Sequence, residues 1–168
     1  MNTILVDTAS RRLVALGESI PCEIGRSGTI AADAKREGDG ASPLGSWPIR
    51  AVLLRSDRVP APVGWQLPWR WIRPDDGWSD DPRDPTYNRP VRHPHAHSAE
   101  RLWRDDGLYD VVVVLGHNDR PPLPGAGSAI FLHCAQSGHP TEGCVAIPTD
   151  ALLWLLARTA LQDVVEIR

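Results

Sequence analysis

Short apolar runs separated by polar turns recur along the chain. Residues 4–6 and 13–16 are apolar and are separated by the polar stretch 7–12, a pattern typical of two strands joined by a turn. Runs 109–115 and 129–133 are almost wholly apolar, which indicates strands covered on both faces. Further strands are predicted at 20–24, 47–54 and 163–167. The pattern therefore favours a mainly β chain.

One segment is predicted to be a helix. It runs through residues 151–158, and Thr149 or Asp150 is expected to cap its first turn. Sixteen prolines and fourteen glycines interrupt the rest of the chain, which suits short strands and ordered loops rather than a helical bundle.

Two segments show neither the strand nor the helix period of apolar residues. Residues 25–45 are dense in glycine and charge and are expected to form an ordered loop. Residues 57–106 either form a lid or binding loop or contain strands too short to recognise. Trp69, Trp71 and Trp78 in this region suit either a binding platform or anchors on the core, whereas Trp47 and Trp154 are assigned to the core.

Length and charge narrow the classes of protein. A chain of 168 residues is expected to form one unit over residues 1–168. Its net charge of -3 provides no basic stripe, so nucleic acid is a poor candidate partner. The first residues lack the basic opening and apolar stretch of a secretory signal, and no apolar run reaches the length of a membrane span.

The cysteines bring in candidate chemistry. Cys22, Cys134 and Cys144 are odd in number, so at least one thiol is free or intermolecular. Cys144 follows Gly143, a residue that allows a tight turn, and His133 ends a predicted strand. A histidine beside a cysteine can take the thiol proton and hold the thiolate as an ion pair, and backbone N–H groups of the Gly143–Cys144 turn can bind an oxyanion.

Other interpretations remain open from the residues alone. An isolated buried cysteine is commonly an inert apolar group, and His117 or His139 can be the partner in place of His133. The four residues His133, Cys134, His139 and Cys144 are also of zinc-ligand type, although their spacing fits no usual pattern. The histidines at 93, 95 and 97 share a face if that segment is extended, as a metal site would require, or lie in a solvated loop.

The stretch from His133 to residue 145 resembles the signature of the L,D-transpeptidase (YkuD-like) catalytic domain. That signature has a histidine ending a strand, then Ser/Thr-His-Gly-Cys and an apolar residue, which Thr141, Gly143 and Cys144 match. A second resemblance covers residues 39–49, and the likeness extends from about residue 22 to 156. The sequence departs from the pattern at Glu142, where histidine is usual, and at Ala146, where arginine is common.

The resemblance implies a fold, a reaction and a set of partners. It implies a curved sheet or β-sandwich with one helix after Cys144. The implied enzyme forms a Cys144 thioester with peptidoglycan stem peptides and passes the acyl group to an amine (L,D-transpeptidase) or to water (L,D-carboxypeptidase). No cofactor or metal is called for, and carbapenem β-lactams are expected covalent inhibitors.

The resemblance also implies residue roles and a location. Cys144, His133 and Gly143 are the expected catalytic residues. The expected substrate-binding residues are Thr141, Glu142, His117 and His139. The family acts in the periplasm or cell envelope, whereas the missing export signal leaves open a cytoplasmic location or a trimmed chain. The alternatives are a cysteine hydrolase of another amide and a non-catalytic cell-wall-binding module.

Overall fold

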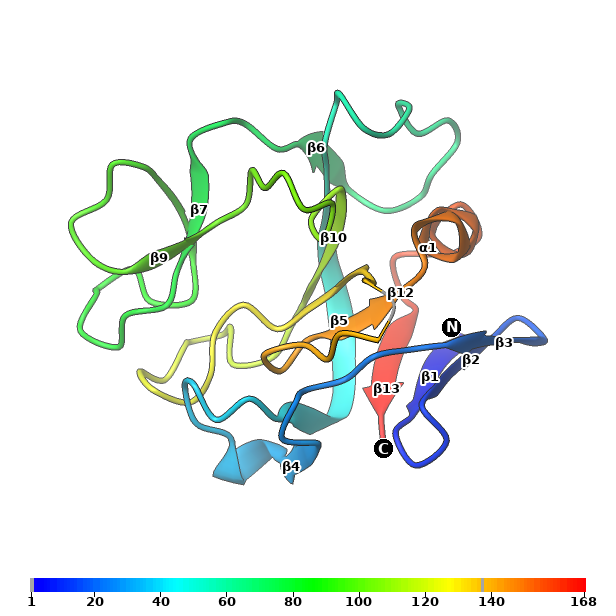
Figure 1. The fold of residues 1–168 in the computed structure, drawn as a ribbon, viewed down its shortest axis with the longest axis horizontal. Helices are drawn as coiled ribbons and strands as arrows, with labels where there is room; N and C mark the ends of the chain where they lie inside the picture. Colours follow the sequence, from blue (N-terminus) through cyan, green and yellow to red (C-terminus); the bar gives the residue numbers. More distant parts are fainter. Residues whose placement is uncertain (1, 137) are drawn as a thin grey trace.

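The main sheet is built around β5 (Ser42–Leu54), the longest strand of the fold (Figure 1). The computed structural model describes residues 2–136 and 138–168. β4 (Thr29–Ala31), which leads into the 3-10 helix η1 (Ala32–Ala34), and β6 (Trp69–Trp71) also pair with β5. The order across the sheet is β12 (Val145–Ile147), β11 (Phe131–Cys134), β10 (Val111–Leu115), β5, β13 (Val164–Ile167), β1 (Thr3–Asp7), β2 (Arg12–Ala15), β3 (Glu18–Pro21).

The predicted opening strand pair is confirmed. β1 and β2 are antiparallel with Leu5 opposite Val14, and β1 also pairs in parallel with β13. The third predicted strand is wrong in its extent, because β3 ends at Pro21. Beyond it Glu23 bonds instead to Ala146, with its N–H 2.8 Å from the carbonyl oxygen. The segment after β3 thus leaves the hairpin and reaches the strand that follows Cys144.

β10 is buried along its whole length, as its apolar run predicts. Val111 and Val113 face the larger core cluster, and Val112 and Val114 face a smaller cluster around Phe131. The strand therefore separates two apolar layers, as expected from side chains that alternate along a strand.

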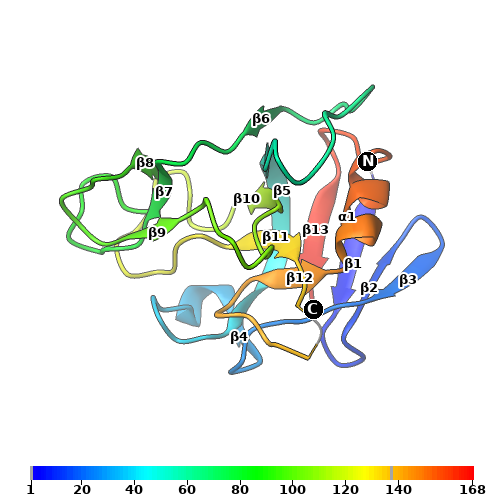
Figure 2. The ribbon, with the colours of Figure 1, turned by 45° about the horizontal axis from the view of Figure 1, so that its top comes forward.

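The helix α1 (Thr149–Leu156) covers the larger cluster through Leu152, Leu155 and Leu156 (Figure 2). Its N-cap is Pro148, which makes no side-chain bond, so the cap predicted at Thr149 or Asp150 is misplaced, although Asp150 Oδ1 accepts the adjacent Ala151 N–H at 2.8 Å. Proline fixes the backbone of that position, which supports the start without a hydroxyl or carboxylate. Among the described helices, none is both long and apolar enough to cross a bilayer. The mainly β prediction with one helix after Cys144 is confirmed.

The central segment contains a second sheet. β7 (Asp76–Ser79), β8 (Pro90–Arg92) and β9 (Ala99–Arg101) pair in the order β8-β7-β9, so residues 57–106 contain short strands rather than an unstructured lid (Figure 1). Trp78 joins this sheet to the main one: its indole meets the Phe131 ring edge-on, with centroids 5.2 Å apart. Its N–H donates to Asn88 at 2.8 Å. Trp78 is therefore an anchor on the core.

The rings of the histidine-rich segment contact different groups, although those of His95 and His97 lie 6.0 Å apart. His95 Nε2 lies 2.6 Å from an Asp84 carboxylate oxygen, and His97 Nδ1 lies 3.5 Å from Asp81. His93 packs on the backbone of Gly77. Within residues 2–136 and 138–168, no group of three or more histidine, cysteine or acidic side chains is arranged to hold a metal ion. Each ring has its own neighbour, so the segment serves to attach the second sheet's loops.

Candidate active site

Cys144 and His133 line the same cavity. Cys144 directly precedes β12, which pairs in parallel with β11 so that His133 lies opposite Ala146. Phe131 and His133 share one face of β11, and the Phe131 N–H lies 3.4 Å from Cys144 Sγ. The cavity has a volume of approximately 390 Å³, within the range of small-ligand sites. The topology thus brings together the two residues that the sequence suggested as a pair.

The turn before Cys144 is held by hydroxyl groups. Thr141 Oγ1 donates to the Cys144 carbonyl at 2.6 Å and accepts the Gly143 N–H at 3.2 Å. Ser42 Oγ donates to the same carbonyl at 3.0 Å. Gly143 has φ +134°, and a Cβ there would lie 3.0 Å from the Ala41 carbonyl oxygen, so a side chain would strain the turn. These contacts fix the backbone that carries the thiol.

The turn contacts change two expected roles. Thr141 was expected to bind substrate, but both of its hydroxyl bonds remain within the turn. The Gly143 N–H, expected to meet an oxyanion, already has Thr141 as its acceptor. The Cys144 N–H has no backbone acceptor among the described residues and is therefore one donor of this turn that is left for a ligand.

Thr141→Val is expected to lower the free energy of unfolding by about 1–3 kcal/mol, because it leaves the Gly143 N–H without its buried acceptor and removes a donor to Cys144. Thr141→Ser keeps the hydroxyl and is the matched control. Chemical denaturation of both variants measures the difference. Equal stability of the two would show that the hydroxyl does not hold the turn.

His133 and Cys144 are both neutral at neutral pH. Burial lowers the pKa of His133 to about 4, and burial, aided by the Glu100 carboxylate, raises the pKa of Cys144 to about 12. His133 Nδ1 lies 2.9 Å from the Cys134 carbonyl oxygen, which can only accept, so Nδ1 carries the proton. The lone pair of the neutral ring is therefore on Nε2. Burial thus disfavours both charges of a thiolate–imidazolium pair in this state of the protein.

The other expected histidines lie in different places. His117 is buried outside the cavity lining: its Nε2 lies 3.1 Å from the Ala126 carbonyl oxygen, and its ring meets Trp47 edge-on. His139 is exposed at the cavity rim. The structure therefore does not support a substrate contact for His117.

Glu142 also lies at the rim of the cavity and is largely exposed. Its carboxylate pairs with the Arg26 guanidinium at 2.7 Å. Glu142, which stands where the family has histidine, therefore forms a surface ion pair. A pair this exposed contributes little to stability.

The other cysteines point away from the site. All three thiols are free and buried. Cys134 lies on the opposite face of β11, within the larger cluster, where its sulfur is 3.8 Å from the Val111 carbonyl oxygen. The four-residue zinc set proposed from composition therefore does not converge.

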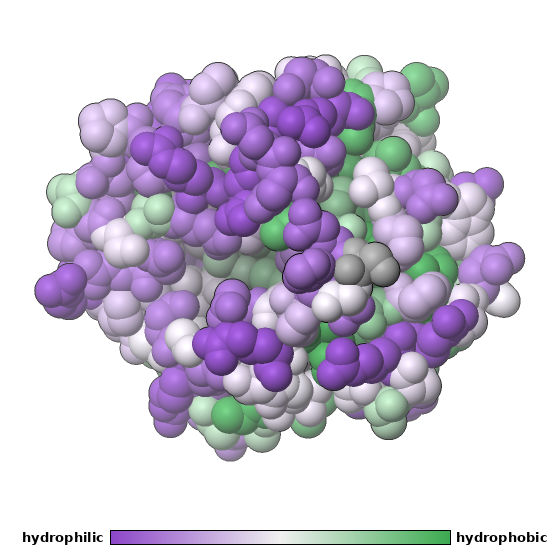
Figure 3. Space-filling model, viewed as in Figure 1, coloured by the Kyte–Doolittle hydropathy of each residue, from purple (hydrophilic) through white to green (hydrophobic). Residues whose placement is uncertain are grey.

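Several cavity residues escape the sequence motifs. Lys35, Asp80, Glu100 and Ser128 line the cavity, and Tyr109 donates to Glu100 at 2.5 Å. Asp80 Oδ1 and Ser128 Oγ are buried without a hydrogen-bond partner in the described chain, so both can bind a ligand. Figure 3 shows a mostly hydrophilic face with a hollow whose floor is more hydrophobic. The sequence signal that could have indicated some of these cavity residues is the cluster of charged residues in segment 35–39 and in β9.

Comparison with known proteins gives a family match over nearly the whole chain. Residues 1–167 match the family model of the L,D-transpeptidase catalytic domain (YkuD). A comparison with curated proteins found no match. Among solved structures, L,D-transpeptidase 1 of Mycobacterium tuberculosis is 12% identical, with a TM-score of 0.40 and coverage of 99% of this chain and 60% of that one. An L,D-transpeptidase from Mycobacterium smegmatis is 12% identical, with a TM-score of 0.41 and coverage of 99% and 57%.

Proposed function

This chain belongs to the L,D-transpeptidase catalytic domain family, and from that membership we propose that it is an acyltransferase with Cys144 as nucleophile and His133 as base. The observation that carries the proposal is the shared cavity, in which His133 has its Nδ1 proton bound to the Cys134 carbonyl and so presents an unprotonated Nε2. A base must be unprotonated at working pH, and a lowered pKa keeps this one so. The chain spans about 60% of the length of the two solved structures.

The proposed reaction has two steps. As substrate fills the cavity, Cys144 Sγ attacks the peptide carbonyl while its proton passes to His133 Nε2, and the carbonyl electron pair moves to the oxygen. The C–N bond then breaks, and the amine leaves with the proton from His133, which gives a thioester. An incoming amine or water reverses the sequence and frees the thiol. The Cys144 N–H is the proposed backbone donor to the developing oxyanion.

Because proton transfer accompanies attack, no free thiolate is needed. The thiol in the ligand-free protein donates its hydrogen bond to the Ala129 carbonyl at 3.1 Å. Substrate binding therefore has to turn this S–H from Ala129 towards His133.

The proposed substrate is a peptidoglycan stem peptide, and the proposed place of action is the cell envelope. The cavity offers carboxylates from Glu37, Asp80 and Glu100, which suit a cationic amine as acceptor. This wall supports transfer to an amine over hydrolysis. We therefore propose L,D-transpeptidation as the main reaction and L,D-carboxypeptidase trimming as the side reaction.

Mass spectrometry of the intact protein tests the proposal. After incubation with a tetrapeptide stem, we expect an adduct on Cys144 that has lost the terminal D-residue, and with a carbapenem an adduct of the whole drug. A mixture of an L,D- and an L,L-bonded peptide separates the proposal from a general cysteine hydrolase, which would take both. A folded protein that gains neither adduct would favour a non-catalytic cell-wall-binding module.

A further inference from the structure

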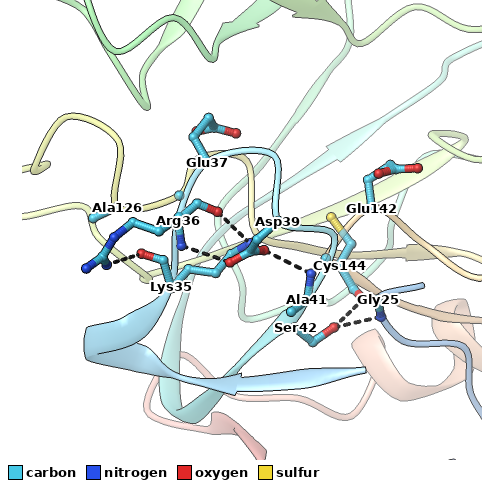
Figure 4. A network of polar contacts seen from close by, with 12 residues as sticks. Gly25, Lys35, Arg36, Glu37, Asp39, Ala41, Ser42, Ala126, Glu142 and Cys144 are labelled. Atoms are coloured by element: carbon cyan, nitrogen blue, oxygen red, sulfur yellow. Dashed lines mark hydrogen bonds and ion pairs between the residues drawn. The ribbon is translucent and has the colours of Figure 1, made fainter. Parts of the chain in front are cut away.

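Lys35 places a buried positive charge at the cavity wall. Its side chain is only 3% exposed, and its ammonium group pairs with the Asp39 carboxylate and donates to the Arg36 carbonyl at 3.2 Å (Figure 4). An ammonium group has three N–H donors, so these contacts leave one over. Lysine is almost never fully buried unless paired, and Asp39 supplies that partner here.

The Asp39 carboxylate ties the loop around Lys35 together through three contacts. Besides the ammonium group, the Asp39 carboxylate accepts the Arg36 N–H at 2.8 Å and the Ala41 N–H at 2.9 Å. These bonds help to hold the pKa of Asp39 below its usual value despite its burial, so this carboxylate stays charged. The position of the cation is thus set by backbone contacts.

This cation lies against the turn that carries the thiol. A Cβ built on Gly143 would lie 3.5 Å from Lys35 Nζ, and one built on Gly127 would lie 2.9 Å from Lys35 Cγ. Both glycines therefore leave room for the lysine to reach the cavity. Figure 4 shows its side chain extending beside Asp39 on the side of the network where Cys144 lies.

The charges that face Cys144 are otherwise mainly negative. Glu100, bonded by Tyr109, lies close enough to raise the pKa of the thiol, and Glu37 and Asp80 add carboxylates to the same wall. His133 is neutral at the start of the reaction. Arg104 also lines the cavity, but it pairs with Asp106 and lies 4.0 Å from Glu100. A negative intermediate here needs a cation that is not already committed to the same wall.

We infer that the Lys35 ammonium contacts the oxyanion formed at the carbonyl attacked by Cys144. This assignment rests on the proposed acyl transfer and adds a catalytic residue to it. Lys35 keeps all its protons: as the S–C bond forms and the thiol proton moves to His133, the negative charge reaches the carbonyl oxygen between the Cys144 N–H and the third N–H of Lys35. When the C–N bond breaks, the electron pair on the oxygen forms the C=O bond again, and the leaving amine takes the proton from His133.

Two neutral variants, Lys35→Gln and Lys35→Met, test the inference beside the charged variant Lys35→Arg. Thermal denaturation checks that each variant is folded. Because there are two neutral variants, the comparison can still be made if one of them does not fold. We expect the rate of Cys144 acylation by the tetrapeptide stem to fall about 10²-fold in the neutral variants, as on losing one oxyanion donor. Lys35→Arg should retain most of the rate.

A second readout needs no acyl transfer. Iodoacetate and iodoacetamide alkylate the same thiolate but differ in charge, so their rate ratio at Cys144, read by peptide mapping, reports the local field and not the ionisation of the thiol. We expect this ratio to fall several-fold in the neutral Lys35 variants and to stay at the wild-type value in Arg104→Met. The same ratio at Cys22 is the internal reference.

The outcomes separate the two proposals. A wild-type protein that no stem peptide acylates would remove the proposed function, while the alkylation ratio still reports on Lys35. An unchanged ratio and acylation rate in folded neutral variants, with an active wild type, would overturn the role of Lys35 alone. An equal fall in Arg104→Met would also overturn it, because the effect would then be general charge at the cavity.

Discussion

Cys144→Ala is expected to have no measurable acyl transfer while remaining folded. Alanine removes the sulfur that forms the thioester, and no other cysteine reaches the cavity among the described residues. Because the thiol is buried beside Phe131, its loss should cost about 1 kcal/mol of unfolding free energy. Release of the terminal D-residue from a tetrapeptide stem measures activity, and chemical denaturation measures stability.

Three further variants complete the comparison. Cys144→Ser can keep both contacts of the sulfur, to the Ala129 carbonyl and from the Phe131 N–H, and should be folded and inactive. Cys22→Ala and Cys134→Ala should retain activity, because both thiols lie in the larger core cluster. Activity in Cys144→Ala, or its selective loss in a folded Cys134→Ala, would contradict the assignment of the nucleophile.

His133→Gln is expected to slow acyl transfer about 10²–10⁴-fold, the usual contribution of a general base. The same variant should leave the pH profile of Cys144 alkylation nearly unchanged, because burial and Glu100 set the raised pKa of the thiol. His139→Ala and His117→Ala are the matched controls and should keep both properties. Loss of activity in His139→Ala with an active His133→Gln would move the role of base to the rim.

The lowered pKa of His133 also fixes a pH dependence. In the folded protein the ring becomes protonated only near pH 4, so activity should persist as pH falls through 6.5 and disappear near 4. The unfolded chain binds this proton near pH 6.5, so the free energy of unfolding should fall as pH decreases from about 6.5 to about 4. His133→Gln should lose this part of the pH dependence. A wild-type activity that titrates near 6.5 would show that the base is solvated.

The sequence predicts most of the main sheet because burial leaves a clear mark there. The run 109–115 matches β10 closely, since a strand covered on both faces tolerates few polar residues. The histidine and cysteine of the motif meet at one cavity because β11 and β12 pair in parallel with a fixed register. The register belongs to the tertiary structure and cannot be derived from the spacing of the two residues along the chain.

The parts that could not be predicted depend on contacts between distant segments. The strands of the second sheet are three or four residues long, too short for a period, and are held by Trp78 on Phe131. The neutral state of His133 and Cys144 follows from burial, which no motif reports. Lys35 looks like one charge in a polar loop until Asp39 and the glycines at 127 and 143 place it at the cavity.

The pairing of β1 with β13 bears on how the chain acquires its structure. Thr3 lies opposite Val164, and the Asn2 N–H donates to Asp163 across 161 positions of sequence, so this ladder closes a loop of nearly the whole chain. Contacts between residues so far apart in the sequence carry a large entropic cost of loop closure, and they slow folding. During synthesis the hairpin of β1 and β2 has to wait with an open edge until β13 has emerged from the ribosome. The open edge of β1 is therefore a place where the nascent chain can aggregate before β13 covers it.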